Sequence, residues 1–448
     1  MPEQRLKEAA TEIFKAGIKA VDPGTCIGKN MHLVNDQLQI QDMTIPLTKT
    51  GKLYVVGMGK ASAAMAAAVE SLLGDRISDG LIITKYGHAR PLKRCRVLQA
   101  AHPVPDANGI AAAQALIDLV STADPDDLIL CLISGGGSAL SPAPVPAINL
   151  QDKQTLTRLL LDCGATIHEI NTVRKHLSRI KGGQLCRYAN KARLISLILS
   201  DVIGDDLDII ASGTTVPDSG TFADCMRIVQ GYGLEQSLPP PVSDYLVQGC
   251  AGQVRETPKP GDPEFDRVSN HIVGCLGDAL LAAEEKAQNL GFFSLLLTST
   301  IHGEAREVAK VLASIGQEVG NRHRPLAPPA CILSGGETTV TLRGNGLGGR
   351  NMELALAAGL ELSGMQNTVL LSAGTDGTDG PTDAAGAFAS GSTVDRAEKK
   401  RISAQEFLAR NDSYHFFKQI DELLITGPTG TNVMDIQILL ILEHSLRP

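Results

Sequence analysis

Short apolar runs alternate with longer stretches of helical periodicity between residues 53 and 210. The apolar runs have the length of buried strands and lie at 53–56, 80–84, 128–133 and 194–199. The helical stretches between them lie at 62–73, 109–120 and 154–161. Strands separated by helices of this length indicate βαβ units and therefore a mostly parallel sheet.

The pattern changes in a proline-rich polar stretch at 239–263, which we interpret as a domain junction. A second α/β pattern follows, with predicted helices at 277–287, 304–312 and 352–358 and predicted strands at 293–297, 331–333 and 369–371. The last apolar runs, at 423–425 and 433–442, look like a hairpin that closes a sheet edge.

These patterns predict an α/β protein of two domains, which is also the expectation for a chain of 448 residues. We expect an N-terminal Rossmann-like, three-layer α/β/α domain with a mostly parallel sheet over residues 1–250. A smaller C-terminal α/β domain with a mixed sheet is expected over residues 265–448. The N-terminus itself is predicted to form an amphipathic helix, with Leu6, Ala9, Ile13, Ala16 and Ala20 on one face.

Four of the apolar runs lead into loops of small and polar residues. Two of these loops contain Gly57, Gly59, Lys60 and Ser62, and Ser134, Gly135, Gly136, Gly137 and Ser138. A third, richer in glycine, contains Ser334, Gly335, Gly336, Glu337, Gly348, Gly349, Arg350 and Asn351, and the fourth covers residues 372–377. We expect the third loop to join a strand to a helix, where backbone N–H groups approach an anion closely and Arg350 adds a cation. Loops at the carboxyl ends of strands indicate ligand sites for phosphate groups.

Composition excludes several classes of function. The formal net charge of −8 offers no general attraction to nucleic acid or to an anionic membrane, and aromatic residues make up only 3% of the chain. No apolar run reaches the roughly 18 residues of a membrane-spanning helix, and the charged N-terminus does not resemble a signal peptide. Nine cysteines without a C-x-x-C pair favour reduced thiols over disulfides or structural zinc. We therefore expect a cytoplasmic protein, and homo-oligomer formation stays open.

The common nucleotide motifs are incomplete in this chain. The segment from Gly57 to Ser62 begins like a dinucleotide fingerprint, but Ser62 replaces the third glycine. The next predicted strand leads into Thr84 and Lys85, where a carboxylate for the ribose would be expected. The same segment is no Walker loop, because Ala61 follows Lys60 where Ser or Thr is needed.

Several charged residues are candidates for phosphate chemistry. Asp201 follows a predicted strand at its carboxyl end, a position suited to a general base. Arg174 and Lys181 belong to a basic segment and are weaker candidates for anion binding. Asp376 and Asp379 lie in an acidic stretch without Lys or Arg, where one or two carboxylates fit magnesium. Each residue also has a purely structural interpretation: helix caps or turns for the aspartates, and a solvated helix face for the cations.

Taken together and in order, these segments resemble the class II glycerate kinases, whose N-terminal domain is of the DUF4147 type and whose C-terminal domain is called MOFRL. The segments are 57–62, 102–106, 134–140, 171–183, 199–202, 334–353 and 372–383. The resemblance implies transfer of the γ-phosphoryl group of ATP to D-glycerate, usually at the 2-hydroxyl, in a cleft between two α/β domains. It also implies that Lys60 and Arg350 are essential and that Asp201 is the base.

Phosphoryl transfer mainly requires placement, neutralisation of charge and an acceptor for the hydroxyl proton. We therefore expect Asp201 to be that acceptor, and Lys60 and Arg350 to bind the glycerate carboxylate or the phosphoryl group. The loop from Ser134 to Ser138 is expected to contact phosphate, with ATP and Mg²⁺ as cofactors. Two alternatives stay open: a hydroxypyruvate reductase that uses NAD(P)H, and a non-catalytic sensor of sugar acids.

Overall fold

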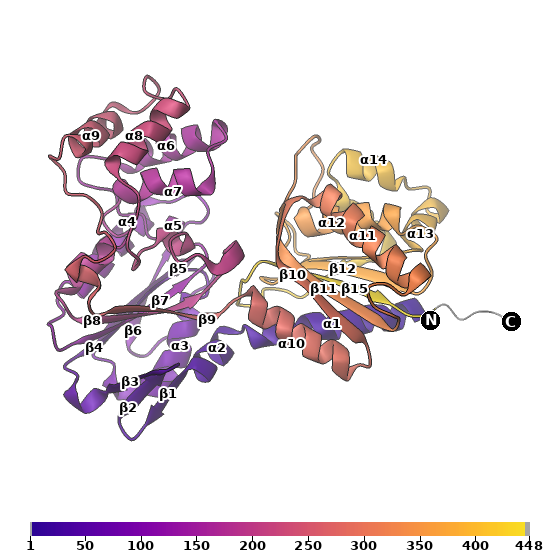
Figure 1. Ribbon diagram of the computed structural model, residues 1–448, viewed down its shortest axis with the longest axis horizontal. Coiled ribbons are helices and arrows are strands. Elements are labelled where there is room, and N and C mark those ends of the chain that lie inside the picture. The colour runs from indigo at the N-terminus through magenta and orange to yellow at the C-terminus, as the bar shows by residue number, and fades with distance from the viewer. Residues whose placement is uncertain (1, 444–448) are drawn as a thin grey trace. The chain divides into compact units, whose positions relative to one another are not determined.

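The computed structural model describes residues 2–443 and divides into two compact units (Figure 1). Unit 2 consists of Cys26–Val273, and unit 1 consists of Met1–Thr25 together with Gly274–Pro448. Each unit is built around a six-stranded sheet.

The sheet of unit 2 has the strand order β6-β5-β4-β7-β8-β9. Its strands are β4 (Leu53–Met58), β5 (Asp79–Lys85), β6 (Cys95–Ala100), β7 (Leu128–Ser134), β8 (Arg193–Leu199) and β9 (Val268–Gly274). The pairs β4–β5, β5–β6, β4–β7 and β7–β8 are all parallel. The predicted parallel sheet is therefore confirmed, and the carboxyl ends of these five strands lie along one edge. Every residue of β4 and β7 is buried, as expected of strands covered on both faces.

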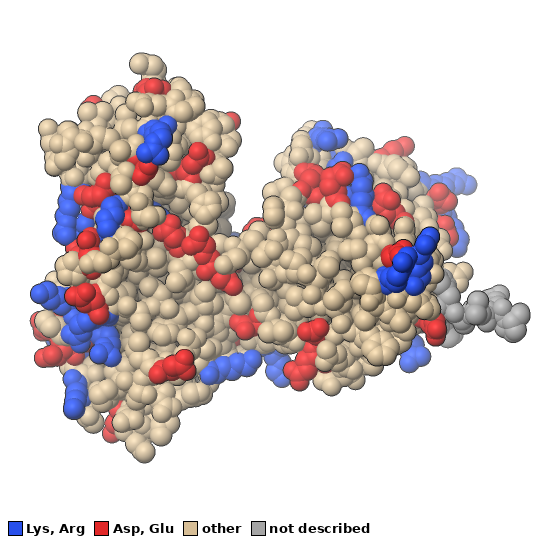
Figure 2. Space-filling view, viewed as in Figure 1, with Lys and Arg blue, Asp and Glu red and all other residues tan. Residues whose placement is uncertain are grey.

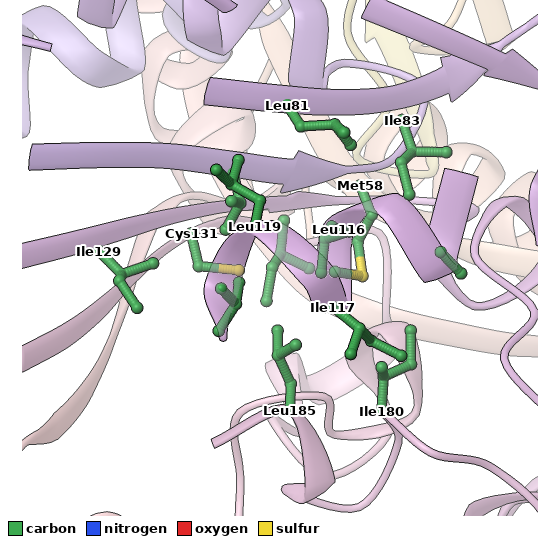
Figure 3. Close-up of a cluster of buried hydrophobic side chains, with 14 of the residues drawn as sticks. Met58, Leu81, Ile83, Leu116, Ile117, Leu119, Ile129, Cys131, Ile180 and Leu185 are labelled. Atoms are coloured by element: carbon green, nitrogen blue, oxygen red, sulfur yellow. The ribbon is translucent and has the colours of Figure 1, made fainter. Parts of the chain in front are cut away.

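Helices cover both faces of this sheet and complete a three-layer arrangement. The helix α3 (Ser62–Leu73) packs on β4, β5 and β7, and α4 (Ala107–Val120) packs on β5 and β6. Side chains of alternate residues in β4, β5 and β7 meet α4, for example Met58, Leu81 and Cys131 (Figure 3). Leu116 and Ile117 of α4 contribute to the same buried cluster.

A group of four helices forms a second hydrophobic cluster within unit 2 (Figure 1). The helices are α6 (Leu150–Asp162), α7 (Ile167–His176), α8 (Phe222–Gly231) and α9 (Pro240–Cys250). Capping boxes fix the starts of three of them: Asn149 with Asp152, Thr166 with Glu169, and Thr221 with Asp224. The fourth, α9, starts with proline at its first position, where no N–H is needed. The remaining strands of the unit, β1 (Met31–Val34), β2 (Gln37–Ile40) and β3 (Met43–Pro46), form an antiparallel sheet beside α2 (Pro23–Asn30).

The sheet of unit 1 is mixed and has the order β10-β11-β15-β12-β13-β14. Its strands are β10 (Phe293–Glu304), β11 (Ala330–Thr339), β12 (Thr368–Gly374), β13 (Gly386–Ser390), β14 (Leu423–Leu424) and β15 (Asp435–Ile441). The helices α1 (Pro2–Ala20) and α10 (Leu276–Asn289) pack together against this sheet. A second pair, α11 (Ala305–Arg322) and α12 (Arg350–Glu361), covers its other face (Figure 1). Three short helices, α13 (Thr393–Lys399), α14 (Ala404–Ala409) and α15 (Ser413–Ile420), complete the unit.

Two details of the expected C-terminal architecture are wrong. The last long strand, β15, is central, because it pairs antiparallel with both β11 and β12 and all of its residues are buried. It therefore closes no edge. The strand β11 is longer than expected and continues through Gly335 and Gly336, which pair with Ile436 and Asp435.

The division into units also differs from the expected domain boundaries. The amphipathic helix α1 forms as predicted, but its apolar face packs on α10, β12 and β15, so it belongs to unit 1. The proline-rich stretch lies inside unit 2, where its first part begins α9.

The surface is charged without a dominant sign on the face shown in Figure 2, where Lys and Arg are interspersed with Asp and Glu. Within residues 2–443, no helix has both the length and the apolar run needed to cross a membrane.

Candidate active site

The strand order of unit 2 places a switch point between β4 and β7. From β4 the chain proceeds to β5 and β6 on one side, and from β7 to β8 and β9 on the other. In parallel sheets, the loops that leave two such strands diverge and open a crevice for a ligand. The loops after β4, β7 and β8 carry Lys60, the glycines at 135–137 and Asp201. The structure thus brings these predicted site segments to one edge of the sheet.

Hydrogen bonds tie the first two loops together. The amide of Lys60 donates to the carbonyl oxygen of Gly135 at 2.9 Å, and the amide of Ala61 donates to Oγ of Ser134 at 3.0 Å. Oγ of Ser62 donates to the carbonyl oxygen of Leu132 at 3.2 Å. Ser62 and Ser134 are fully buried, so their hydroxyls hold the loops in place. Their predicted contact with a ligand remains untested, and their position favours a structural role.

Asp201 lies directly against the first glycine of the second loop. A Cβ atom on Gly135 would overlap Oδ2 of Asp201, so only glycine allows this approach. The carboxylate is partly exposed at the end of β8. The side chain of Asp201, the predicted base, therefore packs against the backbone of the loop from Ser134 to Ser138, which is predicted to bind phosphate.

Lys60 and His102 meet at the next glycine. Gly136 has φ of +82°, and a Cβ atom there would lie 2.9 Å from Cδ2 of His102 and 3.5 Å from Cγ of Lys60. Burial, and then the positive charge of Lys60, lowers the pKa of His102 to about 4. His102 is therefore a neutral imidazole at physiological pH. Since consecutive Cα atoms lie about 3.8 Å apart, Asp201, Lys60 and His102 are gathered around a very short piece of chain.

The end of this loop contacts the two weaker cation candidates. Oγ of Ser138 accepts hydrogen bonds from Nη2 of Arg174 at 2.6 Å and from Nζ of Lys181 at 2.7 Å. Nζ of Lys181 also donates to the carbonyl oxygen of Ser138 at 2.7 Å. Oγ of Ser212 lies 2.9 Å away, and Ser212 in turn donates to Asn171. Arg174 and Lys181 therefore belong to the same neighbourhood as the predicted phosphate loop.

Arg350 stands at the start of α12 in unit 1 and is held by two carboxylates. Its Nε and Nη2 donate to Asp435 at 2.5 and 3.0 Å, and its Nη1 donates to Glu337 at 2.6 Å. Asp435 is buried, with only 1% of its side chain exposed. Burial alone would lower the pKa of Arg350, but the charges of Asp435, Glu337 and Asp379 and the hydrogen bond to Asp435 together outweigh it, so the pKa is raised. Arg350 is a permanently charged and rigidly oriented cation.

The glycine-rich segment before Arg350 has a different structure from the expected loop. Ser334, Gly335, Gly336 and Glu337 lie within β11, and Gly57 lies within β4. Neighbouring atoms fill the space beside these glycines. For example, a Cβ atom on Gly336 would overlap the carbonyl oxygen of Ile301. The hydroxyl of Ser334 donates to Gln437. Close packing within the sheets therefore explains the glycines at 57, 335 and 336, and anion binding by this segment stays a prediction. Gly348 and Gly349 precede α12, where Ser413 and Asp379 lie close against them.

Asp379 caps α12. Its Oδ1 accepts from the amide of Asn351 at 3.1 Å, and its Oδ2 accepts from the amide of Met352 at 2.8 Å. The side chain of Asn351 contacts both Asp379 and Ser372 and is buried. Burial raises the pKa of Asp379 to about 7.

These contacts bear on the predicted magnesium site. Both oxygens of Asp379 are engaged by the helix, and Oδ1 of Asp376 accepts from the amide and hydroxyl of Thr378. A magnesium ion shared by the two carboxylates does not fit this arrangement. In the described part of the chain, no group of three or more His, Cys, Asp or Glu side chains could hold a metal ion.

Three residues in or near these contacts, Asp435, Ser212 and Lys153, were not predicted from the sequence as site candidates. Asp435 begins an apolar strand and gave no signal of its pairing with Arg350. Ser212 adopts the left-handed conformation, with φ of +57°, which a sequence does not reveal. Lys153 did carry a signal, because it shares the buried face of α6 with Leu156 and Leu160, where a lysine is unusual.

Comparison with known proteins identifies the family of this chain. The family described as "Domain of unknown function (DUF4147)" matches residues 9–247, and the MOFRL family matches residues 330–435. D-glycerate 2-kinase of Thermotoga maritima is 41% identical, with 98% of this chain and 99% of the relative covered. A putative hydroxypyruvate reductase of Agrobacterium vitis is 42% identical, with 97% of this chain and 94% of the relative covered. The crystal structure of a glycerate kinase from Thermotoga maritima superposes with a TM-score of 0.87 at 41% identity, covering 98% of this chain and 100% of that one. The chain therefore belongs to the class II glycerate kinase family, with a DUF4147 domain in its N-terminal part and a MOFRL domain in its C-terminal part.

Proposed function

We propose that this protein transfers the γ-phosphoryl group of ATP to the 2-hydroxyl of D-glycerate and releases 2-phosphoglycerate and ADP. One observation carries the proposal. Asp201 lies against Gly135, and Lys60 and His102 lie against Gly136, at the switch point of the unit 2 sheet. The family membership supports the choice of reaction, and a relative named D-glycerate 2-kinase supports the choice of hydroxyl.

Asp201 is assigned as the proton acceptor. In the transfer, the 2-hydroxyl oxygen bonds to the γ-phosphorus, the bond from that phosphorus to the ADP oxygen breaks, and the hydroxyl proton leaves. A carboxylate can take this proton if it lies within hydrogen-bond distance of the hydroxyl. Asp201 is partly exposed and rests on Gly135, so a substrate held by this loop can reach it.

We assign Lys60 the role of stabilising negative charge on the glycerate carboxylate or on the transferring phosphoryl group. It is half-buried beside His102, whose neutral imidazole adds no competing positive charge. Fixed cations near the transferring group stabilise the charge that develops there, and they need no reorganisation during the reaction. His102 can donate or accept one hydrogen bond at the same place.

Arg350 is assigned to an anionic group of the substrates. Three of its N–H donors are used by Asp435 and Glu337. A guanidinium has five such donors, so two stay available for carboxylate or phosphate oxygens. The pairs with Asp435 and Glu337 orient the group in advance, which lowers the entropic cost of binding.

The reductase alternative is supported by the name of one relative, a putative hydroxypyruvate reductase. Two features of unit 2 disagree with it. Gly57 of the incomplete dinucleotide fingerprint is part of β4, and β5 ends in Thr84 and Lys85 where a ribose-binding carboxylate would stand. Assays with NADH and hydroxypyruvate separate the alternatives, since the kinase proposal predicts no substantial oxidation of NADH.

The proposal is tested by replacing Lys60 with methionine and following ADP release in the presence of D-glycerate. Loss of one stabiliser of transition-state charge costs about 10²-fold or more in turnover. Lys85→Met is the matched control, because Lys85 ends the neighbouring strand and also acts on the pKa of His102. Near-normal turnover of a folded Lys60→Met protein would remove Lys60 from the reaction. A wild-type protein that releases no ADP with D-glycerate would refute the kinase proposal.

A further inference from the structure

Two cationic side chains of unit 2, Arg174 and Lys181, meet at Ser138, and a third, Lys153, belongs to the helix packed against α7. Arg174 comes from α7, Lys181 from the segment after it, and Lys153 from α6. Ser138 accepts from Arg174 and Lys181 as described above, and its hydroxyl is the common point between the two cations. We call Lys153, Arg174 and Lys181 the cation cluster.

Lys153 is the residue of the cluster that needs an explanation. Only 5% of it is exposed, and its Nζ atom is buried without a hydrogen-bond partner. Nε of Arg174 is likewise buried without a partner. Helix α6, which carries Lys153, packs against α7, which carries Arg174. The charge of Arg174 acts on Lys153, and the charges of both act on Lys181. Burial and this mutual repulsion lower the pKa of Lys153 to about 7 and that of Lys181 well below its ordinary value.

A neighbouring cation in α7, Lys175, is neutralised by carboxylates. Lys175, next to Arg174, lies 2.5 Å from Asp208 and 3.3 Å from Asp218. No ion pair joins a carboxylate to any member of the cation cluster within residues 2–443. A buried cation without an anion is costly, so such a cluster is favourable only when an anion arrives or when the amines lose their protons.

We propose that Lys153, Arg174 and Lys181, together with the hydroxyl of Ser138, form a binding site for a phosphate group. Three cations match the two negative charges of a phosphate better than the single charge of a carboxylate, and an arginine fork with two lysines is a suitable donor set. The phosphate can come from the nucleotide or from phosphoglycerate, and this identity rests on the proposed function.

The position of the cluster supports this role. Ser138 and Arg174 are partly exposed, whereas Lys153 and Lys181 are buried, so the exposed part of the site is formed by Ser138 and Arg174. Ser138 follows Gly136, the residue against which Lys60 and His102 lie, by two positions. Two residues of chain span at most about 7 Å, so a phosphate at the cluster lies beside the candidate active site.

The variants Lys153→Met and Lys181→Met test the site, with the exposed Lys29→Met as the matched control. Calorimetry with inorganic phosphate, ADP and 2-phosphoglycerate measures affinity, and thermal unfolding without ligand measures folding. We expect at least a tenfold loss of phosphate affinity in both cluster variants and none in Lys29→Met. We also expect an unchanged or raised melting temperature in Lys153→Met, because the buried amine that it removes has no hydrogen-bond partner. Phosphate affinity that stays normal in the folded cluster variants would overturn the proposal.

Binding of ADP and of 2-phosphoglycerate shows which molecule supplies the phosphate group that binds at the cation cluster. Weaker binding of ADP alone assigns the site to the nucleotide, and weaker binding of 2-phosphoglycerate alone assigns it to the product; either result supports the site. Turnover of the wild type is measured in parallel. If the wild type lacks kinase activity while phosphate affinity still depends on Lys153, the proposed function fails and the site stands.

A measurement on the unmodified protein keeps the proposal testable if the variants do not fold. A bound dianion favours the charged forms of Lys153 and Lys181. Sulfate does not titrate in this range. The protein should therefore take up protons at Lys153 and Lys181 when sulfate binds at pH 8. Calorimetry in two buffers of different ionisation enthalpy detects this uptake. Sulfate binding without proton uptake, or no binding of sulfate and phosphate at all, would contradict the proposal.

Discussion

The fold holds Asp201 and Arg350 in different ways. Asp201 is partly exposed and lies against the backbone of Gly135. Arg350 is tied to a buried carboxylate, Asp435, and to Glu337 at the surface. Replacing Asp201 should therefore affect the reaction, whereas replacing Arg350 should affect both the reaction and the fold.

Asp201→Asn keeps the shape of the side chain and removes the proton acceptor. We expect the rate of phosphoryl transfer to fall by roughly 10² to 10⁴, with ATP binding largely kept. Single-turnover kinetics measure the chemical step, and calorimetry measures ATP affinity. Asp206→Asn is the control, because Asp206 lies in the same segment and its side chain accepts from the amide of Asp208. Retained turnover with lowered stability would show that Asp201 is a structural residue.

Arg350→Ala should destabilise unit 1 as well as lower turnover. Removal of the guanidinium leaves Asp435 buried and without its ion-pair partner. Breaking a buried ion pair in this way typically costs about 3–5 kcal/mol. Thermal unfolding of Arg350→Ala and of the double variant Arg350→Gln with Asp435→Asn separates the effects. The double variant should regain stability but not activity, and a single variant with a normal melting curve would contradict the ion-pair argument.

At the scale of elements, glycines have two distinct uses in this protein. Some let strands and loops pack, as Gly336 does in β11. Gly135 instead lets the carboxylate of Asp201 approach the backbone. Sequence alone cannot separate these uses, because the distinction depends on which partner the fold brings beside each residue.

Gly135→Ala should therefore abolish most activity with a smaller effect on the rest of unit 2. The added methyl group would occupy the place of the Asp201 carboxylate and displace it. We expect turnover to fall by about 10²-fold or more, as for a misplaced catalytic group. Gly28→Ala in α2, where no atom lies within 4 Å of the new methyl group, is the control and should leave turnover unchanged. Normal turnover of Gly135→Ala would place Asp201 away from the reaction.

The cap of α12 gives unit 1 a pH-dependent stability. The pKa of Asp379 in the folded protein, about 7, lies above the ordinary value of 3.8 for the unfolded chain. The folded protein thus binds this proton more tightly, so the stabilisation is complete below about pH 4 and is lost as pH rises through about 7. The melting temperature of the wild type relative to Asp379→Asn should fall over this range. A relative melting temperature that rises with pH would show that the ionised carboxylate is the stabilising form.

Much of the fold could be predicted because local patterns were strong. The alternation of short apolar runs and helices gave the parallel sheet of unit 2, and helix α3 has the predicted bounds. The apolar run of β15 could not be placed, since an isolated run does not tell a central strand from an edge strand. The packing of α1 in unit 1 is a contact between distant parts of the chain, and no local pattern encodes it.

The candidate site was only partly accessible from sequence. Lys60, Asp201 and the loop at 134–138 follow strands that end at the same edge, so their proximity followed from the predicted topology. The capping role of Asp379 and the partner of Arg350 depend on β15, whose position was not predicted. Motif order along the chain, more than any single residue, indicated the family.

At the scale of the whole molecule, the candidate site and the family together lead to one claim, that the protein is a D-glycerate 2-kinase. The near full-length similarity to a D-glycerate 2-kinase and the match of both family domains support it. Neither finding identifies the atom of the substrate that receives the phosphoryl group in this protein.

Phosphorus NMR of the reaction product tests this claim most directly. The protein is incubated with ATP, magnesium chloride and D-glycerate, and with Asp201→Asn as the matched control. We predict one new phosphomonoester resonance, coupled to the C2 proton, that appears in equal amount with ADP and forms at least 10²-fold more slowly with the variant. Product phosphorylated at the 3-hydroxyl would contradict the assigned position, and the absence of any phosphoglycerate would contradict the account as a whole.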